Sequence, residues 1–199
     1  MENNHTLVVD MARRRGLLRP CDVEARGFSR TVLSTLARQG KLTRLCRGLY
    51  ALPGRPASEH ASIAEIASKH PNIVVCLLSA LQFYNLTTQS PSEVWIAIDN
   101  KARAPKMDDP PLRIVRFSGD ALSAGVKEHR IDGVTVRITS MAKTVADCFK
   151  YRNKIGLDVA LEALQEAWDA KQVKMDCLWQ CAQICRVTNV MRPYLEMLK

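Results

Sequence analysis

Long apolar stretches are missing from this sequence, because no run reaches the ~18 residues that suggest a membrane-spanning helix. The first ten residues are polar and lack the apolar core of a secretion signal. Neither a phosphate-binding P-loop nor a Gly-x-Gly-x-x-Gly fingerprint occurs. We therefore expect a cytoplasmic protein that carries neither of these nucleotide-binding motifs.

Cysteine pairs with metal-ligand spacing are also missing. The seven cysteines include no Cys-x-x-Cys, and their odd number without a secretion signal argues against a disulfide framework. Cys177, Cys181 and Cys185 recur every fourth residue and would share one face of a helix. Such a row can hold a thiolate metal or redox site, but no histidine lies nearby to complete a tetrahedral set. We favour a buried row of small apolar side chains, and expect no metal and no cofactor.

Groups of residues that indicate catalysis are scarce. The four histidines are far apart, and none is paired with Ser or Cys in a recognisable nucleophile motif. Asp99 and Lys101 follow an apolar strand, a pattern typical of metal-dependent nucleases, which also need an acidic residue on a neighbouring strand. The nearest candidate, Glu93, lies on the same strand. We favour a polar strand end, expect no catalytic residues, and keep a nuclease as the less favoured alternative.

Positive charge is in excess, and it is concentrated at one end of the chain. The 199 residues are 47% hydrophobic, which is ample for a core and leaves room for one or two domains. The formal net charge is +9, and the first 56 residues hold 11 Lys/Arg against 4 Asp/Glu, a net charge of +7. Because a basic segment attracts phosphates through counterion release, we expect this end to bind nucleic acid.

The most informative stretch, residues 19–53, reads RPCDVEARGFSRTVLSTLARQGKLTRLCRGLYALP. A proline suited to a first helical turn, then a glycine and a serine suited to an N-cap, predict two helices joined by a tight turn. A second glycine ends the second helix, and two short strands follow. We expect helices at 7–18, 20–26 and 29–39, and strands at 41–46 and 49–52. This order predicts a winged helix-turn-helix.

The second helix of this motif would have two unlike faces. Its apolar residues recur at helical spacing and face inward, whereas its outward face carries arginines and hydroxyls that can reach base edges or phosphates in a major groove. The arginines of the hairpin, or wing, can reach phosphates or an adjacent minor groove. The predicted DNA-binding residues are Ser29, Arg30, Thr31, Ser34, Thr35, Arg38, Arg44 and Arg47. The alternative is a small helical domain with a solvated basic face.

The rest of the chain predicts a second domain. A Pro- and Gly-bearing stretch at 54–58 marks the boundary, which gives domains at 1–54 and 59–199. Apolar segments, and segments in which apolar and polar residues alternate, predict strands. Asp132-Gly133 predicts a hairpin turn, and apolar residues at helical spacing return from residue 141 onward. The chain is therefore expected to be α+β, with a small, mostly antiparallel sheet packed against several helices after the winged domain.

Several segments resemble the AbiE-type antitoxin (AbiEi) family, the transcriptional repressors of bacterial type IV toxin–antitoxin pairs that are linked to abortive infection of phage. They are RGLYALP after GKLTRLC, NIVVCLLSALQFYNLT, EVWIAI, LRIVRF, GVTVRITSMAKTVADCFKYRNKIG and LDVALEAL. The resemblance spans about residues 16–164. The arginine-rich wing is common to many winged domains, so the combination with SALQFYNLT and TSMAKTVADCF is the more specific part.

This resemblance implies how the protein works. An N-terminal winged domain would bind inverted repeats of double-stranded DNA in its own promoter, with residues 29–39 as the recognition helix and Arg47-Gly48 as the wing tip. A C-terminal domain would supply antitoxicity against a nucleotidyltransferase-like toxin, without a tight complex. Inverted repeats also match two copies of the winged domain on the DNA.

Two questions stay open at this stage. Asp147 lies one helical turn from Lys143 and Tyr151, so it can form an ion pair or a helix-packing hydrogen bond, which we favour, or it can serve antitoxicity. The alternative function is a winged-helix regulator whose C-terminal domain senses a ligand or another protein.

Overall fold

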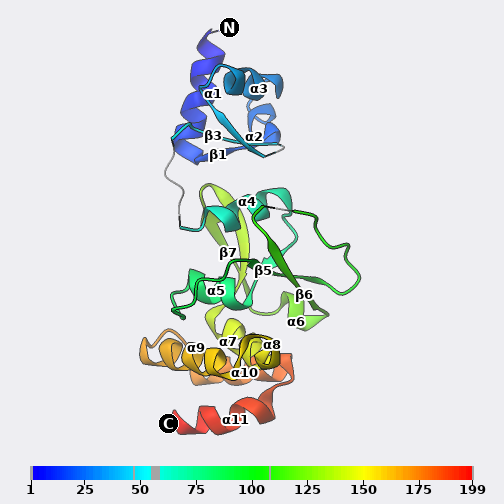
Figure 1. The fold of residues 1–199 in the computed structure, drawn as a ribbon, viewed down its shortest axis with the longest axis vertical. Helices are drawn as coiled ribbons and strands as arrows, with labels where there is room; N and C mark the ends of the chain where they lie inside the picture. Colours follow the sequence, from blue (N-terminus) through cyan, green and yellow to red (C-terminus); the bar gives the residue numbers. More distant parts are fainter. Residues whose placement is uncertain (1, 47, 55–58, 108, 199) are drawn as a thin grey trace. The chain divides into compact units, whose positions relative to one another are not determined.

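A computed structural model gives the fold of the chain and describes residues 2–46, 48–54, 59–107 and 109–198. Its contacts divide the chain (Figure 1) into two compact units, residues 1–69 with 130–135 and residues 70–129 with 136–199. The domain boundary expected at residues 54–58 stays a prediction.

The first unit begins with three helices and a small sheet. Its elements are α1 (Glu2–Arg15), β1 (Leu17–Leu18), α2 (Pro20–Glu24), α3 (Thr31–Arg38), β2 (Thr43–Cys46) and β3 (Leu49–Ala51), followed by α4 (Ala61–Lys69). The three strands pair antiparallel in the order β1-β3-β2. The helices and the hairpin expected between residues 19 and 53 are therefore present, with slightly shorter helices.

The end of the first helix differs from the expected helix over residues 7–18. Gly16 adopts a φ of +81° and ends α1, because this left-handed conformation is open to glycine. Leu17 and Leu18 after it are buried and pair with β3. Two adjacent apolar residues are too few to show the alternation of a strand, so the sequence pattern did not reveal β1.

Apolar side chains from α1, α2, α3 and the sheet form the core of the first unit. Leu33 and Leu36 of α3 are fully buried there. The other buried members are Val8, Met11, Ala12, Leu18, Val23, Leu42 and Tyr50. Burial of this stripe determines which face of α3 is turned toward solvent.

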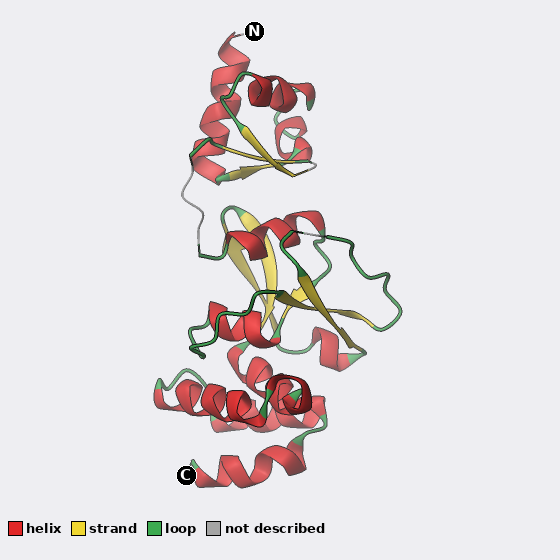
Figure 2. Ribbon diagram, viewed as in Figure 1, coloured by secondary structure: helices red, strands yellow, loops and turns green. Residues whose placement is uncertain are grey.

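The second unit combines a five-stranded sheet with a group of helices (Figure 2). Its strands are β4 (Val74–Val75), β5 (Val94–Asp99), β6 (Leu112–Phe117), β7 (Val126–Ile131) and β8 (Val134–Thr139). Its helices are α5 (Leu77–Phe83), α6 (Asp120–Ser123), α7 (Met141–Lys150), α8 (Arg152–Ile155), α9 (Leu157–Asp169), α10 (Met175–Cys185) and α11 (Thr188–Met197). The tip of the β7-β8 hairpin groups with the first unit.

The sheet is mixed, so the expectation of a mostly antiparallel sheet is wrong. In the strand order β6-β5-β4-β8-β7, β5 pairs parallel to β6 and β4 pairs parallel to β8, whereas β4 and β5 are antiparallel. Parallel neighbours need a connection long enough to carry the chain back along the sheet. Residues 100–111 supply this length between β5 and β6, where the sequence pattern had indicated only a polar loop.

The helices of the second unit are packed around α7. This helix is buried from Ala142 to Phe149, and it contacts α5, α9, α10 and α11. Ser140 caps its start and accepts a hydrogen bond from the backbone N–H of Lys143 at 3.4 Å. Because α5 contacts both β5 and α7, it joins the sheet to the helices. The expected α+β class is confirmed.

Across the described ranges, no helix combines the length and the apolar character that crossing a bilayer requires.

Candidate nucleic-acid interface

The start of α2 is fixed by one carboxylate. Asp22 accepts a hydrogen bond from the backbone N–H of Arg19 at 2.9 Å, which caps the helix in the manner of a capping box. Its two oxygens also receive the side chains of Arg15 at 3.0 Å and Arg19 at 3.1 Å. Asp22 therefore ties the end of α1 to α2 and holds the side chains of two arginines.

The pKa of the Asp22 carboxyl lies below its ordinary value of 3.8. Burial alone would raise this pKa, but hydrogen bonds from the side chain and backbone of Arg19 outweigh burial, and the charges of Arg19 and Arg15 add to them. A lowered pKa means that the contribution to folding is present above pH 3.8 and is lost as the pH falls through the lowered value. This anchor is fully charged at neutral pH.

The turn between α2 and α3 is a Schellman motif centred on Gly27. The N–H of Phe28 donates to the carbonyl of Val23 at 3.0 Å, and the N–H of Gly27 donates to the carbonyl of Glu24 at 2.9 Å. Gly27 has a φ of +80°, which residues with a Cβ atom rarely adopt. The end of α3 repeats the motif with Gly40, at a φ of +70°. Both glycines act as the sequence predicted.

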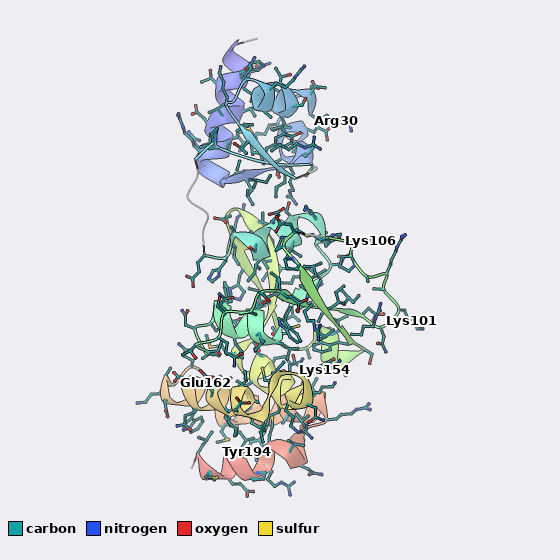
Figure 3. The ribbon with its side chains drawn as sticks, viewed as in Figure 1. Arg30, Lys101, Lys106, Lys154, Glu162 and Tyr194 are labelled. Carbon is teal, nitrogen blue, oxygen red and sulfur yellow. The ribbon has the colours of Figure 1, made fainter. Side chains whose placement is uncertain are left out.

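The outward face of α3 carries most of the residues predicted to bind DNA. Thr35 is half-buried, and the exposed residues are Ser29, Arg30, Thr31, Ser34 and Arg38. Arg30 points away from the core of its unit (Figure 3). Five of these six side chains are therefore open to solvent, and their contact with DNA stays a prediction.

Three hydroxyls on this surface are already arranged by hydrogen bonds. The hydroxyls of Ser29 and Thr31 lie 2.8 Å apart, and Ser34 donates to the carbonyl of Thr31 at 2.8 Å. The proton of Ser34 is therefore used inside the helix, and its oxygen remains able to accept. The helix is regular from Thr31, and Arg30 before it already has helical φ and ψ angles of −56° and −24° and makes no capping bond with its side chain. Ser29 accepts the backbone N–H of Thr31 at 3.4 Å, so it caps the helix as expected.

Arg30 has a partner that it can exchange. Its Nε lies 3.5 Å from Oε1 of Glu24 on α2, and the two side chains are 74% and 49% exposed. An exposed ion pair of this kind contributes about 0–1 kcal/mol, so a DNA phosphate or guanine can replace the carboxylate at little cost. Arg38 is exposed in the last turn of α3, where a cation is favoured by the helix dipole.

The hairpin after α3 supplies the wing of the prediction. Arg44 is exposed on β2 and lies opposite Tyr50 of β3. The pairing becomes irregular between Arg44 and Cys46, as at a β-bulge. Arg47, the other predicted wing residue, lies outside the described residues, and its role stays a prediction.

The first unit matches a known family over most of its length. Residues 7–53 match the family described as transcriptional regulator, AbiEi antitoxin. The resemblance found in the sequence is therefore confirmed over this AbiEi segment, which contains every residue predicted to bind DNA. The match supports a role as a regulator or antitoxin.

Other comparisons extend beyond the AbiEi segment. None of the curated proteins matches the chain. A solved structure, the crystal structure of the RV2827C protein from Mycobacterium tuberculosis, superposes with a TM-score of 0.60 at 15% sequence identity. The similarity covers 91% of this chain and 71% of that chain, and at this identity it shows a shared fold alone.

Outside the AbiEi segment, the Asp99-x-Lys101 pattern proves to be part of a turn. Asp99 accepts the backbone N–H of Lys101 at 2.8 Å, an Asx-turn that follows the end of β5. Arg116 of β6 donates to three carbonyls of the same turn. Glu93 lies near Arg113, at 4.0 Å, at the other end of the strand. The pattern thus has a structural explanation that needs no metal.

Asp147, also outside the AbiEi segment, is buried. Its two oxygens each lie 2.6 Å from Nζ of Lys143, and the two side chains are 1% and 0% exposed. Cys185 donates its S–H to Asp147 at 3.2 Å. The favoured ion pair therefore exists, but in the core and not at the surface.

The cysteine row is only partly a buried stripe. Cys181 and Cys185 are buried, whereas Cys177 at the start of α10 is exposed. Burial raises the pKa of the Cys185 thiol to about 12, and the neighbouring carboxylate of Asp147 adds to this. The thiol therefore stays protonated and serves as a hydrogen-bond donor, which agrees with a structural role.

Proposed function

We propose that the chain is a DNA-binding transcriptional repressor and antitoxin of a type IV toxin–antitoxin system. The observation that carries this proposal is the outward surface of α3, which presents Arg30, Arg38 and a group of hydroxyls from a helix whose other face is buried. The charge of the first 56 residues and the AbiEi match over the same segment support it.

The proposed chemistry is that of a winged helix-turn-helix. The helix α3 enters a major groove, where an arginine can form a bidentate contact with guanine and hydroxyls can bond to bases or phosphates. Arg44 and Arg47 of the wing contact phosphates or the adjacent minor groove. The site uses no cofactor and no metal.

The repressor would act on its own promoter. Inverted repeats place two half-sites on the DNA in two-fold symmetry, so two copies of the chain would bind together. The family resemblance adds the antitoxin role, in which the second unit counters a nucleotidyltransferase-like toxin without a tight complex.

The test of DNA binding replaces both arginines of the α3 surface. In Arg30→Ala with Arg38→Ala, we expect loss of the preference for the gene's upstream region over random duplex, because each bidentate base contact contributes about 1–3 kcal/mol of discrimination. Fluorescence anisotropy with labelled duplexes, repeated over a range of salt concentrations, measures both the preference and its electrostatic part. Wild-type affinity should fall steeply as salt rises.

Two controls make the result specific. Lys174→Ala with Arg192→Ala removes the same charge from exposed positions of the second unit and should leave the preference intact. Circular dichroism should show that the α3 variant is folded, since neither arginine belongs to the core. An unchanged preference in the folded α3 variant would remove α3 as the recognition helix.

A further inference from the structure

The loop between β5 and β6 carries a second group of exposed cations. Its first part, residues 100–107, reads NKARAPKM and is called the basic loop here. Lys101, Arg103 and Lys106 are exposed, and Lys101 and Lys106 point outward from the loop (Figure 3). The basic loop itself contains no acidic residue. Asp99 precedes it in the sequence, and Asp108 and Asp109 follow it.

The connection between β5 and β6, whose first part is the basic loop, is held at both ends. At its start, Nη1 of Arg116 donates to the carbonyls of Asp99, Asn100 and Ala102 at 3.1, 2.7 and 2.9 Å. At its end, the carbonyl of Pro111 accepts the N–H of Val94 at 2.8 Å. These bonds attach the connection to the sheet at both ends.

The composition of the basic loop suits contact with the phosphate backbone of a duplex. Between its cations lie only Ala102, Ala104 and Pro105, which are small or rigid and let the backbone approach a duplex closely. Spacings of two and three residues separate the cations by up to roughly 7 and 10 Å in an extended chain, so each can meet a different phosphate. The loop has no aromatic residue, whereas proteins that bind single strands stack bases on aromatic rings.

We propose that the basic loop is a second DNA-contacting element, which binds the phosphates of duplex DNA and does not read sequence. This inference rests on the proposed DNA-binding function of the first unit. The contact adds affinity because both elements belong to one chain, which raises the effective concentration of the second contact once the first has formed. Specificity stays with α3, and the loop contributes equally on operator and random duplex.

The experiment uses the full chain with Lys101→Ala, Arg103→Ala and Lys106→Ala combined. We expect affinity at low salt to fall about 10- to 100-fold for the upstream duplex and for random duplex alike, so that their ratio stays constant. The slope of log affinity against log salt should become shallower by about one for each cation that meets a phosphate. Anisotropy titrations at several salt concentrations measure all three quantities.

The matched control is Lys171→Ala, Lys174→Ala and Arg192→Ala, which removes the same charge from exposed positions elsewhere in the second unit. An unchanged salt slope in the loop variant, or an equal change in the control, would overturn the inference. A loss confined to the upstream duplex would also overturn it, since that pattern belongs to base readout. Failure of the wild-type chain to bind any duplex would instead refute the proposed function.

Discussion

At the scale of single residues, the most consequential side chains of the second unit are a buried ion pair. Burial disfavours the ammonium of Lys143, but the carboxylate of Asp147 outweighs burial and raises the pKa of Lys143. The ammonium also lies 4.8 Å from the ring centroid of Phe117. The sequence indicated the pairing through its i, i+4 spacing, but burial depends on α10 packing over α7, which no local pattern records.

Removing one partner of this pair should destabilise the second unit. In Asp147→Asn the ammonium loses its counter-charge while it remains buried, which costs about 3–5 kcal/mol. Lys143→Met with Asp147→Leu leaves no buried charge and should cost much less. All three tryptophans, Trp95, Trp168 and Trp179, lie in the second unit, so their fluorescence during urea unfolding follows this unit by itself. An equal loss in the single and double variants would show that packing, and not charge, is decisive.

At the scale of elements, the sequence predicted those whose signals are local. The glycines at 27 and 40, the apolar stripe of α3 and the Asp132-Gly133 turn each specify their structure within a few residues. The strand β1 and the parallel pairings of β5 and β6 were missed, because they depend on contacts between distant segments. For the same reason, the solvent-facing side of α3 followed from its local pattern, whereas the exchangeable pairing of Arg30 with Glu24 did not. The binding of DNA by this surface stays a prediction.

The turn at Gly27 sets the position of α3 and can be tested alone. Nothing lies within 4 Å of a Cβ added at Gly27, so the cost of Gly27→Ala comes from its φ of +80°. A left-handed alanine costs about 1–2 kcal/mol, and the opening free energy of the α3 amides in hydrogen exchange should fall by this amount. Gly119→Ala changes a glycine of the second unit at which an added Cβ also meets nothing within 4 Å, and it should leave the exchange of the α3 amides unchanged. Unaltered α3 exchange in Gly27→Ala would mean that the turn does not limit the stability of this helix.

At the scale of the whole molecule, different kinds of observation bear on the role of each unit. The AbiEi segment combines a family match, concentrated positive charge and an exposed surface of defined chemistry. The second unit shares its fold with a solved structure, but its sequence patterns specify elements and not a partner. A surface for the proposed antitoxin role could not be predicted, because surfaces that bind weakly or transiently leave no periodic signal in a sequence.

If repression and antitoxicity belong to different units, a variant can lose one and keep the other. We expect Arg30→Ala with Arg38→Ala to protect cells from a neighbouring nucleotidyltransferase-like toxin as well as wild type does, because neither arginine lies in the second unit. Both genes should be expressed from separate inducible promoters, so that autoregulation does not change their levels, and growth is measured.

Asp147→Asn supplies the opposite case in the same assay. It should lose protection at temperatures where tryptophan fluorescence shows the second unit unfolded, while the first unit still prefers the upstream duplex over random duplex. Loss of protection in the α3 variant at wild-type protein levels would contradict this division of labour. A neighbouring gene that is harmless without the antitoxin would favour a regulator that senses a ligand or another protein through its second unit.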